Sequence, residues 1–275
     1  MRGSVSVLGE IVAATRARVH QQRQSLPLDR LLAQGPPRAG ARRSLSGALA
    51  RAGRVNVIAE FKRRSPSRGA IRSDLRPVAV CQAYEAAGAV ALSVLTEPEY
   101  FGGCLDDLQQ ARSATQLPAL RKDFILDVYQ VWESWIAGTD AVLLIVAALS
   151  ELELKTLLAT AGEAGIEALV EVHDAAELRR ALIAGARIVG VNNRDLRTLE
   201  VSLDTSFGLV DAIPDDVVAV AESGLRTGED LRRLREAGYD AFLIGERLML
   251  AEDPGSALAT LLGDAGDPGP RGEAP

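Results

Sequence analysis

Eight short apolar runs alternate with eight longer, helix-like segments from residue 55 onward. The runs are rich in Val, Ile and Leu, and VNVIAE, AVLLIV and VVAVAE are nearly continuous in their hydrophobic character. Strands of a parallel sheet that is covered on both faces have this pattern. The predicted strands are Val55–Glu60, Val90–Leu95, Pro118–Lys122, Asp140–Val146, Ile166–Val172, Arg187–Val191, Val217–Glu222 and Ala241–Ile244.

The segments that follow these strands have the length of crossover helices. They are Arg76–Ala87, Leu105–Thr115, Asp127–Ala137, Glu151–Ala164, Asp174–Ala184, Leu203–Ile213, Thr227–Ala237 and Pro254–Leu262. Eight such units in about 210 residues is the size of a closed barrel. An open doubly wound sheet would usually carry a glycine-rich turn after its first strand, and EFKRRSPSRG lacks that pattern. The sequence therefore predicts the α/β class and a (β/α)₈ TIM barrel over residues 55–263.

Residues 1–54 differ from the rest of the chain in charge. Ten arginines stand there against two acidic residues, a local balance of +8 in a chain of net charge -6. A basic, acid-poor start is typical of a transit peptide or a nucleic-acid-binding arm. However, Leu8, Ile11, Val12 and Val19 recur at helical spacing. We therefore expect an extra N-terminal helical segment, followed by a loop, that packs on the barrel.

Composition excludes several classes of protein. Two cysteines and two histidines cannot supply a zinc site of several Cys and His ligands, and they do not form a disulfide scaffold at this size. No apolar run reaches the roughly 20 residues of a membrane helix, and no secretory signal pattern is visible. We therefore expect a cytoplasmic protein. Residues 264–275 contain Gly, Pro and charged residues without an apolar period, so we expect a disordered tail.

Polar side chains gather where the predicted strands end, which is where barrels of this kind build their active sites. Only three of the 31 Lys and Arg residues are lysines, and Lys62 and Lys122 follow the first and third strands, whereas Lys155 looks like a surface residue. Unlike Arg, a Lys can be tuned to exchange its proton or to form an imine. The other strand-end residues are Glu60, Arg121, Asp123, Glu171, His173, Asn192, Asn193, Arg194, Glu222 and Ser223. The set predicts acid–base chemistry on an anionic substrate.

Glycines follow the last two predicted strands, at Gly224 and Gly245. A glycine lets backbone N–H groups approach an anion closely, and the loops after strands seven and eight are the usual phosphate site of such barrels. Ser65, in the loop after the first strand, could add a hydroxyl group. These residues predict a substrate with a phosphate at one end. A metal site is not expected, because the two lysines would repel a divalent ion held by the three glutamates.

Motifs at all eight predicted strand ends occur in an order found in one enzyme family. They are IAEFKRRSPSRG, SVLTEPEYFGG, LRKDFILDVYQV, DAVLLIVAAL, ALVEVHD, VGVNNRDLRTLEV, VAESGL and FLIGERLM. On these motifs the chain resembles the indole-3-glycerol-phosphate synthase family. The opening LGEIVAATRARVHQQRQSLPL is similar to the extra N-terminal helix of that family, which argues against a transit peptide.

The resemblance implies a reaction of tryptophan biosynthesis. The substrate would be 1-(2-carboxyphenylamino)-1-deoxyribulose 5-phosphate, which closes a ring and loses CO₂ and water to give indole-3-glycerol phosphate. No cofactor is implied, because protonation and the leaving CO₂ drive the electron flow. The partner would be this small phosphorylated molecule, with no nucleic acid or membrane, and we expect a monomer.

The resemblance also implies roles for single residues. Lys122 would be the general acid that activates the ketone, Lys62 would meet the substrate carboxylate and donate a proton in the dehydration, and Glu171 would be the general base. Glu60, Asn192 and Glu222 would orient hydroxyl and ammonium groups and the developing cation, and Arg194 would support the carboxylates. Phosphate would fall to Ser65, Ser223, Gly224, Gly245 and the backbone N–H of Glu246, and Phe101, Phe124, Leu143 and Leu199 would line the pocket for the aromatic ring.

Two positions depart from the family pattern. Glu246 stands where many relatives have Ser, so its carboxylate must turn away from the phosphate. Cys104 also stands where Ser is usual, and nothing follows from it.

The sequence leaves three questions open. A second lysine nearby would lower the pKa of Lys122, whereas the carboxylates would oppose that shift. A Schiff-base aldolase, with Lys122 or Lys62 attacking a sugar-phosphate carbonyl, is an alternative enzyme. A non-catalytic phosphate-binding barrel is an alternative of another class, but it predicts damaged strand-end acids and bases, and these are all present.

Overall fold

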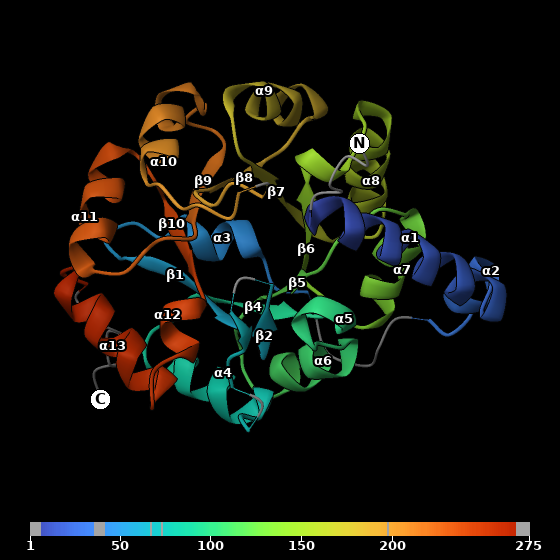
Figure 1. Ribbon diagram of the computed structural model, residues 1–275, viewed down its shortest axis with the longest axis horizontal. Helices are drawn as coiled ribbons and strands as arrows, with labels where there is room; N and C mark the ends of the chain where they lie inside the picture. The colour runs from blue at the N-terminus through green and yellow to red at the C-terminus, as the bar shows by residue number, and fades with distance from the viewer. Residues whose placement is uncertain (1–6, 36–41, 67, 73, 197, 268–275) are drawn as a thin grey trace, which may run out of the picture.

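The computed structural model describes residues 7–35, 42–66, 68–72, 74–196 and 198–267. Eight parallel strands close into a barrel in the order β1-β10-β9-β8-β7-β6-β5-β4, so the predicted fold is confirmed (Figure 1). The strands are β1 (Asn56–Phe61), β4 (Ala91–Leu95), β5 (Ala119–Lys122), β6 (Ala141–Ile145), β7 (Glu167–Val172), β8 (Ile188–Asn192), β9 (Val218–Glu222) and β10 (Ala241–Ile244). Each predicted strand agrees with the structure to within one residue at both ends.

A ring of helices covers the outside of the barrel (Figure 1). Its members are α4 (Pro77–Ala86), α6 (Leu105–Ser113), α7 (Val128–Ile136), α8 (Glu151–Glu163), α9 (Ala175–Ala184), α10 (Asp204–Leu209), α11 (Gly228–Ala237) and α13 (Pro254–Asp264). Four short elements lie between them: α5 (Pro98–Phe101), α12 (Glu246–Met249) and the 3₁₀ turns η1 (Val146–Ala148) and η2 (Val210–Ala212). The single helix predicted over Leu203–Ile213 is therefore divided, because its last turn tightens into η2.

Local sequence explains where the helices begin and end. Ser150 and Thr227 each cap a helix through a reciprocal pair of hydrogen bonds with the acidic residue three positions later. Gly185 and Gly238 end α9 and α11 in the left-handed conformation, which glycine adopts without a steric penalty. The helix boundaries thus follow from residues that satisfy the terminal backbone groups.

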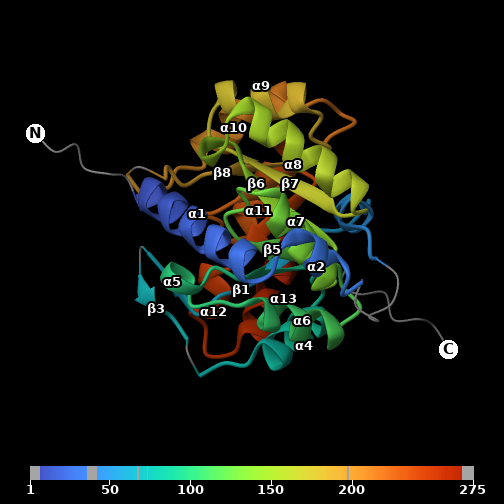
Figure 2. The ribbon, with the colours of Figure 1, turned by 90° about the vertical axis from the view of Figure 1, so that its right-hand side faces the viewer.

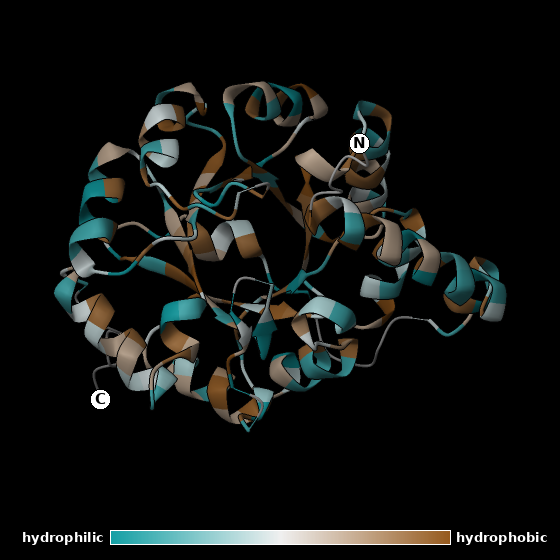
Figure 3. Cartoon of the chain, in the orientation of Figure 1, coloured by the Kyte–Doolittle hydropathy of each residue, from teal (hydrophilic) through white to brown (hydrophobic). Residues whose placement is uncertain are grey.

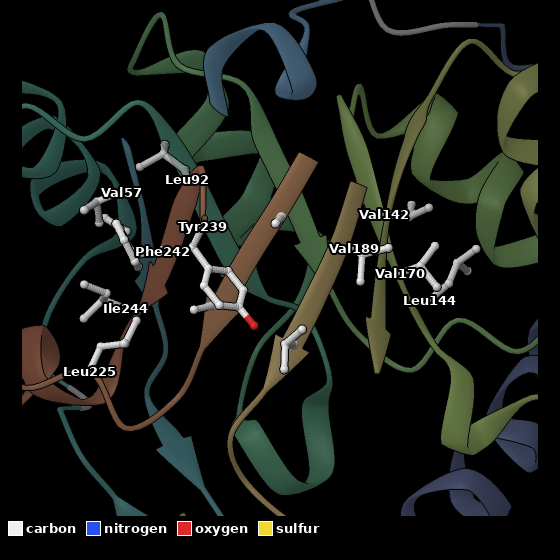
Figure 4. Packing of buried hydrophobic residues seen from close by; sticks show 14 of the residues in the cluster. Val57, Leu92, Val142, Leu144, Val170, Val189, Leu225, Tyr239, Phe242 and Ile244 are labelled. Carbon is white, nitrogen blue, oxygen red and sulfur yellow. The ribbon is translucent and has the colours of Figure 1, made fainter. Parts of the chain in front are cut away.

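The core has two layers because side chains alternate across each strand. On β1, Val57, Ala59 and Phe61 pack outward against the helices, whereas Ile58 packs inside the barrel. Figure 4 shows the outward layer, in which Val57, Phe242 and Ile244 lie on one side of the barrel and Val142, Val170 and Val189 on the other. The strands are correspondingly hydrophobic in Figure 3, while the helices carry hydrophilic residues on their outer faces. Alternation also directs Glu60, two residues after Ile58, into the barrel.

In the described part of the segment before the barrel there are three helices, α1 (Val7–Ser25), α2 (Leu28–Leu32) and α3 (Leu45–Leu49). Leu45 and Leu49 belong to the inner core of the barrel, so α3 closes its amino end (Figure 1). Helix α1 contacts α7 and η1, and Figure 2 shows its start at the same end of the molecule as β3. The predicted helix is therefore present in this segment, while residues 36–41 of the predicted loop lie outside the described residues.

Two further features differ from the sequence prediction. A two-stranded antiparallel sheet, β2 (Arg64–Ser65) and β3 (Gly69–Ala70), occupies the loop after β1. At the other end, α13 continues to Asp264, and the next residues to Asp267 are described. Ala265 is buried, and Arg54 lies 3.8 Å from Asp267, so the prediction of disorder was wrong for this start of the segment. Residues 268–275 lie outside the described residues. Among those that are described, no helix is both long enough and apolar enough to span a membrane.

Candidate active site

A cavity of about 520 Å³ opens at the carboxyl ends of the barrel strands. The strand-end residues Arg121, His173 and Asn193 do not line this cavity, but every residue to which the resemblance assigns a role does. The residues with an assigned role are Glu60, Lys62, Ser65, Phe101, Lys122, Phe124, Leu143, Glu171, Asn192, Arg194, Leu199, Glu222, Ser223, Gly224, Gly245 and Glu246. The structure thus brings together residues from every part of the barrel, while their individual roles stay predictions.

Lys122, the last residue of β5, lies between two carboxylates. Its Nζ is 2.8 Å from Glu171 Oε2 of β7 and 2.8 Å from Glu222 Oε2 of β9. Burial alone would lower the pKa of Lys122, but Glu171, Glu222 and Glu60 together outweigh burial and hold that pKa above its usual value. The sequence left open whether the second lysine or the carboxylates would dominate the pKa of Lys122. In the structure the carboxylates dominate it. Lys122 is a fully charged ammonium group at neutral pH.

The two carboxylates that hold Lys122 differ from each other. Glu171 also accepts a hydrogen bond from Asn192 Nδ2 at 3.0 Å. Burial would raise the pKa of Glu171, but Lys122 and His173 outweigh it and hold that pKa well below the usual range. Burial instead raises the pKa of Glu222 to about 7, with Lys122 opposing and Glu171 adding to the shift. Within the described chain, Glu222 Oε1 has no hydrogen-bond partner. The site therefore holds one firmly ionised carboxylate and one that titrates near neutrality.

Lys62 and Glu60 form a separate ion pair on the first strand and its loop, with 2.8 Å between Nζ and Oε1. The hydroxyl group of Ser93 lies 3.5 Å from the other carboxylate oxygen of Glu60. A Cβ atom on Gly245 would lie 2.2 Å from Glu60 Oε1, and one on Gly190 would lie 2.1 Å from Glu222 Oε1. Glycine at these two positions therefore makes room for the buried carboxylates, a steric role that sequence reasoning did not assign.

Two non-glycine residues among those described have a positive φ angle, and both line the cavity. They are Leu199, with φ 62°, and Ser223, with φ 64°. Strained backbone of this kind concentrates at functional sites. The buried Asn193 helps to hold Ser223, because its Nδ2 donates to the carbonyl oxygens of Glu222 at 3.0 Å and Ser223 at 3.2 Å. Asn193 was recognised in the sequence only as a strand-end amide, and the structure places it behind the site.

The end of the cavity predicted to bind phosphate carries a charge cluster. Arg68 Nε lies 3.0 Å from Glu246 Oε1, and Arg194 Nη2 lies 3.7 Å from Glu246 Oε2. The carboxylate of Glu246 therefore connects the loops after β1, β8 and β10. Arg68 was not predicted, although it lies in the FKRRSPSRG motif, because its arginine neighbours give no signal that distinguishes it.

Part of the cavity lining is apolar. Phe101 and Phe124 lie with ring centroids 6.3 Å apart at 39°, close to Leu143 of β6. Helix α1 adds Val7, Leu8 and Ile11 to the lining. Leu8 and Ile11 belong to the amphipathic pattern recognised in the sequence, which was not placed in the site. Among the described residues, no group of three or more His, Cys, Asp or Glu side chains is arranged to hold a metal ion.

The fold and the cavity define a (β/α)₈ barrel enzyme with acid and base side chains at the carboxyl ends of its strands. Residues 8–261 match the family model of indole-3-glycerol phosphate synthase. The chain belongs to the indole-3-glycerol phosphate synthase family, and it is therefore a lyase.

Curated relatives agree with this placement, and a solved structure agrees with the barrel fold. The chain is 44% identical over 260 residues to indole-3-glycerol phosphate synthase of Polaromonas naphthalenivorans, covering 94% of this chain and 99% of the relative. It is 48% identical over 259 residues to the protein of the same name from Laribacter hongkongensis, covering 93% and 98%. A 3-hexulose-6-phosphate synthase from Salmonella typhimurium is similar in fold alone, with a TM-score of 0.59 at 13% identity over 76% of this chain and 98% of that one.

Proposed function

We propose that this protein converts 1-(2-carboxyphenylamino)-1-deoxyribulose 5-phosphate into indole-3-glycerol phosphate, with release of CO₂ and water, in tryptophan biosynthesis. The observation that carries the proposal is Lys122 held at 2.8 Å by both Glu171 and Glu222 inside the cavity. Relatives named indole-3-glycerol phosphate synthase, which are 44–48% identical to this chain, support the proposal. We also propose that the protein acts in the cytoplasm as a monomer, with a small phosphorylated substrate as its partner.

Ring closure needs a proton at the ketone oxygen as the aromatic carbon attacks the ketone carbon. Lys122 is the proposed donor, because its neighbours keep it protonated at neutral pH. When Lys122 turns from the carboxylates to the ketone oxygen, it loses the interactions that raise its pKa but stays buried. Burial favours the neutral amine, so the proton becomes easier to give up. Its acidity thus rises where the proton is needed.

Glu171 is the proposed base, since loss of the Lys122 charge beside it raises its affinity for a proton. Lys62 is proposed to meet the substrate carboxylate and to donate a proton in the dehydration, in place of its pairing with Glu60. Asn192, Glu60 and Glu222 orient the substrate hydroxyl groups and stabilise the developing cation. General acids and bases of this kind contribute typically about 10²–10⁴-fold each.

The two ends of the substrate are proposed to bind at different parts of the cavity. The aromatic ring contacts the apolar part of the lining that includes Phe101 and Phe124, and Leu143 and Leu199 extend it. The phosphate contacts the loops after β1, β9 and β10, through Ser65, Ser223, Gly224, Gly245 and the backbone of Glu246. Arg194 supports the carboxylates between them. In this proposal the ketone lies near Lys122.

The experiment is an assay of the purified protein with this substrate, following the fluorescence of the indole product and the released CO₂. Equal amounts of product and CO₂ are expected. Absence of turnover by the folded protein would refute the function. Borohydride treatment in the presence of substrate is the second arm, and a covalent adduct on Lys122 or Lys62 would instead indicate a Schiff-base aldolase.

A further inference from the structure

His173 lies directly behind Glu171, outside the cavity. It follows β7, two residues after Glu171, and its ring Nε2 is 3.3 Å from Glu171 Oε1. This is a close charge contact without hydrogen-bond geometry, since Nε2 has no hydrogen-bond partner in the described chain. The side chain is 13% exposed, and it does not line the cavity. It therefore cannot reach a substrate, but it can act on the carboxylate that is the proposed base.

Glu177, in the first turn of α9, fixes this histidine from the other side. One oxygen, Glu177 Oε2, lies 3.0 Å from the ring Nδ1 and also accepts the backbone N–H of His173 at 2.9 Å. Burial alone would lower the pKa of His173, but Glu171 and Glu177 outweigh it and raise that pKa to about 10. In the described chain, the charged groups that contact the ring are these two glutamates. His173 is therefore an imidazolium ion at neutral pH.

The importance of this charge follows from the proposed movement of Lys122. Burial opposes the ionised form of Glu171, and Lys122 and His173 are the cations that offset burial. Once Lys122 has given its proton to the ketone, His173 is the cation still in contact with Glu171. Without that cation, a carboxylate buried to this degree would favour the protonated form and could no longer accept a proton from the substrate.

We propose that His173 is a positioning residue of the reaction, a fixed cation beside Glu171 that keeps this carboxylate ionised while Lys122 is engaged with the substrate. This inference rests on the proposed function. It assigns a task to a residue that lies outside the cavity. Glu177 has a part in the same proposed role, because it holds the imidazole ring of His173 in place and keeps that ring charged.

The protonation state can be measured directly, because the chain has only two histidines. The other, His20, is exposed on α1, so His20→Gln leaves a single imidazole without touching the site. In this variant, labelled with ¹⁵N-histidine, NMR is expected to show a doubly protonated ring throughout pH 6–8. Adding Glu177→Gln, which keeps an oxygen as acceptor but removes the charge, is expected to lower the pKa of His173. A ring that is neutral at pH 7 would overturn the proposal.

The kinetic test uses His173→Gln, with His20→Gln as the matched control. We expect kcat to fall about 10-fold with KM little changed, because the lost interaction acts on a proton-transfer group. In a Glu222→Gln background, Glu171 is the carboxylate that still accepts a hydrogen bond from Lys122. There, adding His173→Gln is expected to move the acid limb of the pH profile upward by about one unit, since removing a nearby cation raises a carboxylate pKa.

The kinetic results distinguish this proposal from a structural role of His173. A lower kcat without any movement of the acid limb would indicate a merely structural role and overturn the proposal, as would unchanged kinetics. The thermal midpoint of each variant shows whether it is folded. If His173→Gln does not fold, Glu177→Gln carries the same test, with a smaller loss of kcat expected near neutral pH and a larger one as the pH rises. Inactivity of the wild-type protein would refute the proposed function rather than this inference.

Discussion

The two ends of the barrel bury carboxylates in different ways. At the amino end, Asp140 accepts hydrogen bonds from the Arg112 guanidinium at 2.9 and 3.0 Å and from the backbone N–H groups of Arg43 and Ala119 at 2.9 and 3.0 Å. At the carboxyl end, Glu171 and Glu222 share the amine of Lys122. Both groups of carboxylates are almost fully buried.

The difference lies in the partners. Backbone N–H groups and arginine do not release protons in the accessible pH range, so Asp140 can only stabilise the fold. A lysine can exchange its proton and can turn toward another acceptor, and Glu222 keeps one oxygen without a partner in the described chain. Buried charge at the amino end therefore stabilises the fold, whereas buried charge at the carboxyl end is available for chemistry. Barrels of this kind generally have their active sites at the carboxyl end and residues important for stability at the amino end.

The largest effect that would test this comparison is expected for Lys122→Arg. The substitution keeps the charge between the two glutamates but removes a group that can release its proton. We expect kcat to fall about 10²–10⁴-fold with a smaller change in KM, and little change in the thermal midpoint. The measurement is the indole fluorescence assay over a range of substrate concentrations.

Lys155→Arg is the matched control for that variant, because Lys155 is exposed on α8 and the same atoms are changed. Its activity should equal that of the wild type. Near-normal turnover by Lys122→Arg would show that charge alone suffices at this position. The carboxyl end would then not differ from the amino end in needing a cation that can release its proton.

At the amino end, Asp140→Asn should affect stability rather than catalysis. The change removes the negative charge of Asp140 that faces the Arg112 guanidinium at 2.9 Å, where the arginine side chain is 5% exposed. Breaking a buried pair in this way costs about 3 kcal/mol or more in the free energy of unfolding. Urea denaturation measures this loss, while kcat per folded molecule should stay at the wild-type value. A large loss of kcat in folded protein would contradict the assigned role of this end.

The strands could be predicted because their physical cause is local. Continuous apolar runs such as VVAVAE identify buried parallel strands, and alternation within them places Glu60 and Glu222 inside the barrel. The partners of these groups could not be predicted, because the pairing of Lys122 with both Glu171 and Glu222 depends on the register of separate strands. The sequence therefore predicted many of the cavity residues, but it did not predict Arg68, the contribution of α1 or which carboxylate is ionised.

Other differences have a similar origin. The β2–β3 sheet was missed because its strands have only two residues each, too few for any periodicity. Ala265 is buried by contact with the start of α11, where a Cβ atom on Gly228 would lie 2.5 Å from its backbone nitrogen. A contact between segments that are distant in the sequence produces no recognisable pattern in the sequence of a short Gly- and Pro-containing tail.

A smaller effect on kcat is expected for Glu222 at the carboxyl end, and it is tested through the pH dependence of activity. The pKa of this residue is raised to about 7, so the carboxylate is protonated below this pH and ionised above it. If the reaction needs the ionised form, activity should rise through pH 7. Glu222→Gln should reduce kcat about 10-fold at pH 8 and move the acid limb to lower pH, because Glu171 ionises well below its usual range. An acid limb that stays near pH 7 in the variant would assign it to another group.

The smallest expected effect concerns the rim of the carboxyl end, where Glu246 pairs with Arg68 and Arg194. A substrate phosphate at this place would compete with the carboxylate for the same cations. Glu246→Ser should therefore lower KM, but by less than about five-fold, because partly exposed ion pairs contribute only about 0.2–1 kcal/mol. Glu163→Ser, at an exposed position on α8, makes the same change of charge and should leave KM unaltered. A higher KM for Glu246→Ser would mean that the carboxylate orients the two arginines for binding, and the rim would then resemble the amino end, where a fixed anion holds its partners in place.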